Sequence, residues 1–273
     1  MPSSYVRECS IRKSFNRAVN VHGTHYVKVS RNFIYDIMGG AYFLEDSVEI
    51  GNEFSYNLAI FVKTSSSLLN EDSTPAAYWV TNPNNTVIHN SVAGGTHFGF
   101  WYRLLDRPDG PSFDQNYCPK KIPLGRFFNN TIHSSGRIGS EWSHVGIETK
   151  NNVYHNHFSK NIQPLIATFY NENTGPAILN SIIIGNSDNL DTKSLTESGI
   201  VLAWDRGQLI KNVTFINFPS DKSHCMRGPE IHGTCFNNLS QEKKSKVFGF
   251  SWLEKKLNIE YRIIQILEDQ RFE

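Results

Sequence analysis

The stretch that decides the fold class reads Tyr78-Trp-Val-Thr-Asn-Pro-Asn-Asn-Thr-Val-Ile-His-Asn-Ser-Val-Ala-Gly-Gly-Thr-His-Phe-Gly-Phe-Trp-Tyr-Arg103. It contains three short apolar or alternating pieces, at 78–80, 87–92 and 98–102, separated by an Asn-Pro-Asn-Asn turn and a Gly-Gly pair. Each piece is too short for a helix and is rich in β-branched and aromatic residues, which is typical of strands. The pattern predicts an all-β chain whose short strands wind into the coils of a parallel β-helix.

The first 45 residues repeat at a fixed interval. A shift of 23 residues superimposes small and apolar side chains: Val6 on Val29, Ile11 on Ile34, Ala18 on Ala41 and Val21 on Leu44. A flat coil cannot bury its inner side chains alone, so equivalent inner positions must recur and stack. We predict about seven to nine coils on a repeat of about 22 residues.

Asparagine recurs where the coils are expected to turn, because it tolerates the left-handed backbone of a sharp corner. Asn130 lies 45 residues after Asn85, about two predicted coils, and Asn152 follows 22 residues later. Asparagines stacked at equivalent corners would form a ladder of side-chain amides that satisfies buried backbone groups.

The predicted coils occupy residues 1–218. Two polar, turn-rich stretches at about 63–77 and 105–121 are expected to protrude as loops. The regularity weakens in residues 219–273, which we interpret as a C-terminal cap or as truncated last coils.

The composition excludes several classes of protein. A formal charge of +1 in 273 residues provides no broad basic surface, so nucleic acid is not an expected partner. No apolar run reaches the ~18–20 residues that cross a bilayer, and the first residues have no apolar core of a signal peptide. The low charged content of 19% favours a β-rich extracellular protein. Because an extracellular protein needs a signal peptide, we expect this chain to be a segment of a longer protein.

Two further features fit an extracellular location. N-glycosylation sequons begin at Asn84, Asn129, Asn212 and Asn238. Cys225 and Cys235 permit one local disulfide. For Cys9 and Cys118, ordinary buried thiols are as good an interpretation as a disulfide.

Four side chains of the central stretch form the main candidate ligand site: His89, His97, Trp101 and Arg103. A sugar ring could stack on the tryptophan while the arginine pairs with a uronate carboxylate. However, Trp101 has Phe100 and Tyr102 as neighbours, and alternate residues of a strand point to opposite faces. Packing in the core or at a corner is therefore the competing interpretation.

Two other clusters are candidate binding sites. His155 and His157 lie on one side of a strand and could begin a metal site, but a third ligand is not identifiable and solvated histidines are favoured. The acidic residues of neighbouring coils could line a polysaccharide groove or form a solvated face: Asp36, Glu45, Asp46 and Glu49. No nucleophile-elbow, phosphate-loop or dinucleotide motif occurs, so we predict no cofactor, no metal and no assignable catalytic residue.

Several segments between about Val19 and Ser135 resemble the fibrocystin-L family. The resemblance rests on residues 55–62, 74–86, 93–103, 108–112 and 122–131. More distantly, the Asn-Pro-Asn-Asn and Gly-Phe-Trp elements are similar to the cell-surface and secreted hyaluronan-degrading proteins. The resemblance implies a right-handed parallel β-helix from the extracellular part of a very large, membrane-anchored surface protein.

The function expected from this resemblance is an extracellular scaffold or recognition segment of a receptor or coat protein, with a glycosaminoglycan or another extracellular molecule as its ligand. The alternative is part of a hyaluronan- or glycosaminoglycan-degrading hydrolase. The sequence favours the non-enzymatic interpretation, because it offers no recognisable acid/base pair.

Overall fold

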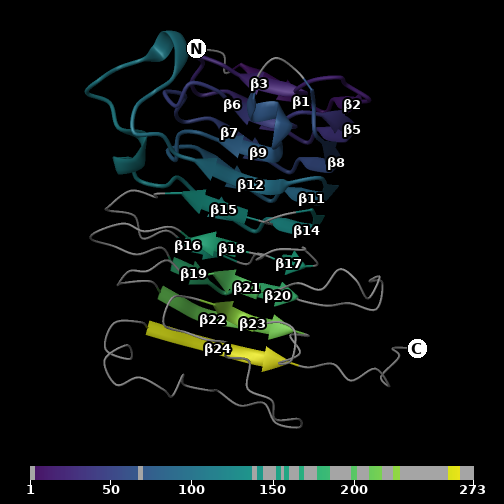
Figure 1. Ribbon diagram of the computed structural model, residues 1–273, viewed down its shortest axis with the longest axis vertical. Helices are drawn as coiled ribbons and strands as arrows, with labels where there is room; N and C mark the ends of the chain where they lie inside the picture. Colours follow the sequence, from purple (N-terminus) through teal and green to yellow (C-terminus); the bar gives the residue numbers. More distant parts are fainter. Residues whose placement is uncertain are drawn as a thin grey trace.

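The computed structural model describes residues 4–66, 70–136, 180–184 and 213–216, together with the backbone of further strands named below. The chain forms a parallel β-helix in which each coil contributes short strands to three faces (Figure 1). Every pairing between the strands named below is parallel, as the sequence predicts. The N-terminal coils lie at the top of Figure 1 and successive coils stack downward.

The first face consists of β1 (Tyr5–Arg7), β4 (Lys28–Ser30), β7 (Glu53–Ser55), β10 (Thr86–Ile88), β13 (Phe127–Phe128), β16 (Asn152–Tyr154), β19 (Ala177–Leu179), the first half of β22 (Leu209–Ile216) and β24 (Asn258–Ile264). The second face consists of β2 (Ser10–Arg12), β5 (Phe33–Met38), β8 (Leu58–Lys63), β11 (Ser91–Gly95), β14 (Thr131–Ser135), β17 (His157–Ser159), β20 (Ile182–Ile184) and the second half of β22. Both faces belong to one 16-stranded sheet.

The third face is a separate eight-stranded sheet. It consists of β3 (Val19–Val21), β6 (Tyr42–Leu44), β9 (Ala76–Val80), β12 (Phe98–Arg103), β15 (Ser140–Ser143), β18 (Ile166–Thr168), β21 (Ser198–Val201) and β23 (His224–Arg227). The eight strands agree with the predicted seven to nine coils. Because β23 and β24 extend the two sheets, strands within residues 219–273 continue the stack.

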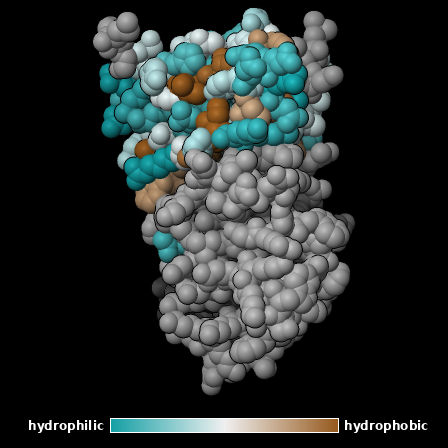
Figure 2. Space-filling view, turned by 90° about the vertical axis from the view of Figure 1, so that its left-hand side faces the viewer, coloured by the Kyte–Doolittle hydropathy of each residue, from teal (hydrophilic) through white to brown (hydrophobic). Residues whose placement is uncertain are grey.

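The 23-residue repeat is confirmed. Val6 pairs with Val29, Ile11 with Ile34 and Val21 with Leu44, each in register. Their inward side chains stack into one continuous core along the axis of the molecule. The surface seen in Figure 2 is mainly hydrophilic over the described upper coils, with small hydrophobic patches.

The corner between the first and second faces has the same two-residue form in six described coils. The first residue adopts a left-handed backbone and points outward: Glu8, Arg31, Tyr56, His89, Asn129 and Asn180, with φ between 48° and 58°. The second residue is buried in five of these coils, as Asn32, Asn57, Asn90, Asn130 and Ser181, whereas Cys9 in the first coil is exposed. Such a backbone is uncommon for residues other than glycine and is held here by the coils above and below.

The inward asparagines form the predicted amide ladder. Asn32 donates its backbone N–H to the Asn57 side-chain oxygen at 3.0 Å, and Asn57 donates in the same way to Asn90, and Asn90 to Asn130. The steps down the ladder from Cys9 to Asn130 are 23, 25, 33 and 40 residues. The predicted constant repeat of about 22 residues is therefore too short for the two coils that carry long connections, whereas the spacing returns to 26 residues from Thr131 to His157 and 25 from His157 to Ile182.

The prediction that Asn85 and Asn130 stack in one ladder is wrong. Asn85 does not share a column with Asn130, because Asn130 stacks one coil below Asn90. Asn85 instead receives the backbone N–H of Asn52 at 2.8 Å, in a second short ladder at another corner. Asn152 begins β16, and its side chain lies outside the described residues.

Two long connections flank the third face, one entering it and one leaving it. One joins β8 to β9 and contains η1 (Asn70–Ser73), and the other joins β12 to β13 and contains η2 (Gly110–Ser112) and η3 (Pro119–Lys121). The second connection, teal in Figure 1, rises beside the stack to the level of the first coils. There the backbone N–H of Asp109 donates to the carbonyl of Asp46 at 3.1 Å.

Candidate functional site

A column of aromatic side chains runs down the outside of the third face. Phe43, Trp79 and Trp101 occupy equivalent positions in β6, β9 and β12. Phe43 stacks on Trp79 with ring centres 5.1 Å apart, and Trp79 meets Trp101 edge-on at 4.6 Å. They form a cluster separate from the main core, because alternate residues of each strand point to opposite sides.

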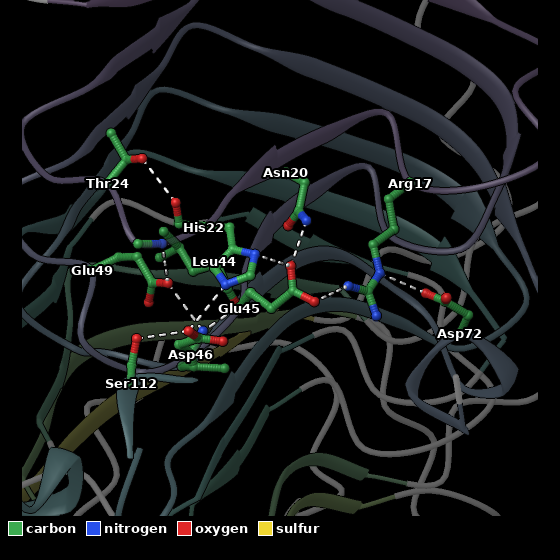
Figure 3. A network of polar contacts seen from close by, with 12 residues as sticks. Arg17, Asn20, His22, Thr24, Leu44, Glu45, Asp46, Glu49, Asp72 and Ser112 are labelled. Carbon is green, nitrogen blue, oxygen red and sulfur yellow. Dashed lines mark hydrogen bonds and ion pairs between the residues drawn. The ribbon is translucent and has the colours of Figure 1, made fainter. Parts of the chain in front are cut away.

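Arg17 closes the upper end of this column, and Figure 3 shows its contacts with Glu45 and Asp72. Its guanidinium carbon lies 3.6 Å from the centre of the Phe43 ring. Its Nε donates to Asp72 Oδ1 at 2.9 Å, and one terminal nitrogen lies 3.1 Å from Glu45 Oε1. The first connection is therefore fastened onto the third face, since Asp72 belongs to η1.

His22 lies between two carboxylates. Its Nδ1 is 3.5 Å from Glu45 Oε2 and its Nε2 is 3.1 Å from Asp46 Oδ2. The imidazole is half exposed, at 49% of its side-chain surface, whereas Asp46 is 5% exposed. The protonated ring can donate to both carboxylates at once, whereas the neutral ring has one donor.

Asp46 is held by both neighbouring segments. Ser112 Oγ, from η2 of the long connection, donates to Asp46 Oδ2 at 2.7 Å. The backbone N–H of Asp46 donates to Glu49 Oε1 at 3.0 Å. The same Glu49 oxygen also accepts a hydrogen bond from the Gly23 N–H at 3.0 Å.

Glu49 is fully buried, and its second oxygen, Oε2, has no hydrogen-bond partner among the described residues. Tyr117 lies near it, and burial raises the pKa of this phenol above its usual value. A hydrogen bond from Asn82 acts in the opposite direction on that pKa, and the Glu49 carboxylate raises it further. The site is thus rich in carboxylates that are positioned by backbone donors.

The structure brings three of the four predicted ligand residues to the same region. Trp101 and Arg103 point outward from β12, whereas Phe100 and Tyr102 are buried in the core, so both predicted orientations occur in one strand. Arg103 lies over the Trp79 ring at 5.5 Å. Trp101 packs against Phe98 at 4.4 Å, and His97 bonds to Thr96 Oγ1 at 3.0 Å just before the strand.

Trp101 carries one unusual feature. Its indole Nε1–H is buried and has no hydrogen-bond acceptor among the described residues. Buried indole donors usually have a partner, so an acceptor supplied by a ligand would improve this position.

His89 lies elsewhere. It occupies the outward position at the corner between β10 and β11, where its ring stacks on Tyr56 at 4.6 Å. Its Nδ1 lies 2.7 Å from the side-chain nitrogen of Asn129. His89 therefore belongs to a different surface from Trp101 and Arg103.

The predicted acidic group divides in the same way. Glu45, Asp46 and Glu49 lie together in the polar network, whereas Asp36 forms an ion pair with Lys63 near the end of the second face. In the described part of the chain, no three histidine, cysteine or acidic side chains are arranged to hold a metal ion.

Other predicted residues fall partly outside the described residues. His155, Asn238 and Cys235 lie outside them, and His157, Asn212 and Cys225 belong to strands whose side chains are not described. Asn84 and Asn129 are exposed, as sequon asparagines must be to carry sugar. Cys9 and Cys118 are free thiols.

Sequence reasoning missed Arg17, His22, Asp72 and Ser112. One signal was available, because His22 and Glu45 are separated by the same 23 residues as the paired strands around them. Asp72 and Ser112 belong to loops, whose folding back onto the third face leaves no periodic trace in the sequence.

Comparison with known proteins places these features in a family. The model for the CEMIP β-helix matches residues 1–140. The chain is 42% identical to Fibrocystin-L of Homo sapiens over 276 residues and equally similar to that of Mus musculus, with 85% of this chain covered. It is 33% identical over 165 residues to the human Cell migration-inducing and hyaluronan-binding protein, which covers 50% of this chain.

The chain spans only 6% of the length of the Fibrocystin-L proteins and 12% of the human hyaluronan-binding relative. Among the residues that the structure describes, no helix has the length and apolar character that a membrane span requires.

Proposed function

The chain belongs to the CEMIP β-helix family and is a homologue of Fibrocystin-L, and from this we propose that it is an extracellular recognition segment of a much larger cell-surface protein. Its ligand is an acidic polysaccharide of the glycosaminoglycan type, bound on the outer surface of the third face. The stacked coils act as a rigid support for that surface.

The observation that carries this proposal is the partly exposed pair of Trp101 and Arg103 at the lower end of the aromatic column, whose other rings, Phe43 and Trp79, are buried. Sugar rings pack against indole faces, and a guanidinium pairs with a uronate carboxylate in two parallel hydrogen bonds. Trp101 and Arg103 offer these two contacts side by side on β12. The unpartnered Trp101 Nε1–H adds a donor for a sugar oxygen.

A second argument comes from the relatives. One of them is named a hyaluronan-binding protein, and hyaluronan is a polymer in which every second sugar carries a carboxylate. The carboxylate-rich end around Glu45 and Asp46 would repel such a chain, so we assign the polymer to the Trp101–Arg103 end of the third face.

The test is titration of the 273-residue chain with size-defined hyaluronan oligosaccharides. We expect saturable binding that weakens about tenfold or more in Trp101→Ala and in Arg103→Ala. Tyr26→Ala is the matched control, since Tyr26 is an exposed aromatic residue at a different corner, and its affinity should be unchanged. Unchanged affinity in both third-face variants would remove this surface from consideration.

A second candidate function is hydrolysis of the same polysaccharide class. The observation that favours it is the half-exposed His22 held between Glu45 and Asp46, since a positioned imidazole or carboxyl group can donate a proton to a glycosidic oxygen. In this case the carboxylate-rich end of the face would act on a chain held by Trp101 and Arg103.

This candidate predicts shortening of hyaluronan at neutral or mildly acidic pH, by this chain alone or with its flanking sequence. Cleavage should be lost in Glu45→Gln and His22→Asn while binding persists. If neither the chain nor the longer protein shortens the polymer, the hydrolase is excluded and recognition stands alone.

A further inference from the structure

The outer surface of the second face contains an apolar row that spans the third coil. It consists of Tyr56, Leu58, Ile60 and Phe61, whose side chains lie outside the core. Tyr56 is 57% exposed and Phe61 47%. In the coil above, Phe33 and Tyr35 are 40% and 41% exposed, with their rings parallel within 4°. So many neighbouring exposed apolar groups are unusual on a soluble surface and indicate that something covers them.

A sequon begins two coils below this row, in the same corner column. Tyr56, His89 and Asn129 are the left-handed outward residues of three successive coils. His89 stacks on Tyr56 with ring centres 4.6 Å apart and planes within 12°. Asn129 Nδ2 lies 2.7 Å from His89 Nδ1. The nitrogen that would carry a glycan is therefore already directed toward the aromatic pair.

The rest of the sequon is part of the fold. Asn130 lies in the amide ladder at 1% exposure, and Thr131 Oγ1 donates to Ser91 Oγ at 2.9 Å. These contacts fix the orientation of the corner, so a group attached to Asn129 would leave the surface in a defined direction along the corner column.

We propose that Asn129 carries an N-linked glycan whose first sugars lie along His89 and Tyr56 and cover the apolar row. The glycan would come from a lipid-diphosphate-linked oligosaccharide: a bond forms between sugar C1 and Asn129 Nδ2, the C1–O bond to the diphosphate breaks, and Nδ2 loses one proton. The nitrogen keeps its second proton and can still donate to His89 Nδ1. The apolar faces of the sugars then meet the Tyr56 ring.

This inference rests on the extracellular location in the proposed function, but it concerns a different surface. Asn84 provides an internal comparison, since it is also an exposed sequon asparagine but lies at the corner between β9 and β10. No residue of the apolar row belongs to that corner, so Asn84 serves as a sequon without this row.

The test uses the 273-residue chain secreted from glycosylating cells, with occupancy measured by peptide mass spectrometry at Asn129 and Asn84. The folded glycoprotein is then digested with a glycosidase that releases N-glycans. We expect occupancy at Asn129 and release there roughly fivefold slower than in Tyr56→Ala, where the stacking partner is missing. Release from Asn84 should be equal in the two proteins.

A second measurement tests whether the glycan covers the apolar row. The Asn129→Asp variant keeps a residue that tolerates the left-handed backbone but cannot be glycosylated. We expect it to bind more of an apolar fluorescent dye than the parent, and Asn84→Asp to match the parent.

Three results would overturn the proposal: an empty Asn129 beside an occupied Asn84, no occupancy at either site, or an Asn129 glycan released equally fast with and without Tyr56. None of them affects hyaluronan binding at Trp101 and Arg103, so the proposed function is judged separately.

Discussion

The hydroxyl of Tyr42 donates to the backbone carbonyl of Asn32 at 3.2 Å, across the full width of the coil. One coil below, Tyr78 makes the same bond to the carbonyl of Asn57 at 3.4 Å, and the two rings stack at 4.7 Å. Core tyrosines of the third face are thus tied to the asparagine corner on the opposite side. The amide ladder and the aromatic core form one connected interior.

These buried tyrosines should ionise only when the chain unfolds. Burial raises the pKa of Tyr42, Tyr78 and Tyr102 well above the usual value of 10.0. A folded-state pKa above the unfolded value leaves stability intact below pH 10 and removes it as the pH rises further. We expect an absorbance titration to show these phenols ionising together with the loss of β-sheet circular dichroism. Ionisation of all tyrosines before unfolding would contradict the buried positions.

Replacement of a ladder asparagine should be costly. The Asn57 side chain donates to Val29 O at 2.8 Å and accepts from Asn32 N–H at 3.0 Å, so Asn57→Ala removes two buried hydrogen bonds and the acceptor of the Asn32 N–H. We expect a loss of about 3 kcal/mol in the free energy of unfolding, measured by urea titration. The exposed Asn116 serves as the control, because Asn116→Ala leaves these contacts intact. An equal loss in both variants would mean that the ladder does not stabilise the stack.

Arg17 should matter far more than a surface arginine. Arg17→Ala removes the cation above Phe43 and leaves the buried Asp72 carboxylate, 1% exposed, without its ion pair. We expect a loss of about 3–5 kcal/mol in unfolding free energy. Arg31→Ala breaks an ion pair with Glu8 whose members are 66% and 59% exposed, and should cost under about 1 kcal/mol.

A double variant tests the reason for that loss. Asp72→Asn removes the carboxylate charge that Arg17 faces, so the combined variant should recover part of the stability lost in Arg17→Ala. Strict additivity of the two losses would show that Arg17 stabilises the fold by packing alone.

The pair of Glu53 and Lys28 predicts a small acid-dependent loss of stability. A hydrogen bond from Ser55 is the main cause that lowers the Glu53 pKa, and Lys28 lowers it further. A folded pKa below the unfolded value of 4.5 gives stability that is present above pH 4.5 and is lost as the pH falls through the lowered value. The two side chains are 36% and 51% exposed, so solvent screening keeps the effect below about 1 kcal/mol.

The measurement is urea unfolding of the parent and of Glu53→Gln at pH 7 and pH 3. The parent should lose more stability than the variant between these pH values, and Ser55→Ala should give an intermediate loss. Parallel pH profiles for all three proteins would show that Glu53 has no such role.

The fold could be predicted from the first two coils because nothing interrupts them. Val6, Val29 and Phe54 follow one another down the core at nearly constant spacing, so stacking leaves a visible repeat in the sequence. Two long connections intervene between Phe54 and Phe127, so sequence distance there no longer measures distance along the axis. A constant repeat therefore places Asn130 in a column with Asn85, whereas it lies beneath Asn90.

The candidate site was predictable in its strands but not in its loops. Alternation along β12 predicts that neighbouring residues face opposite sides, and the structure shows that Trp101 and Arg103 are the pair outside the main core. Asp72 and Ser112 reach the same face from connections that fold back onto it, and no sequence period relates them to Glu45 or Asp46. The polar network could therefore be identified only from the structure.

The two-residue corner between the first and second faces determines where the chain can change in length. One extra residue at Asn57 or Asn90 would turn every following inward side chain of that strand outward, because strand residues alternate. The connections after β8 and β12 carry no such constraint, since the next strand is aligned by its neighbours rather than by the loop. Insertions and deletions can therefore accumulate beside the aromatic column of the third face, so its specificity can diversify while the rod itself is unchanged.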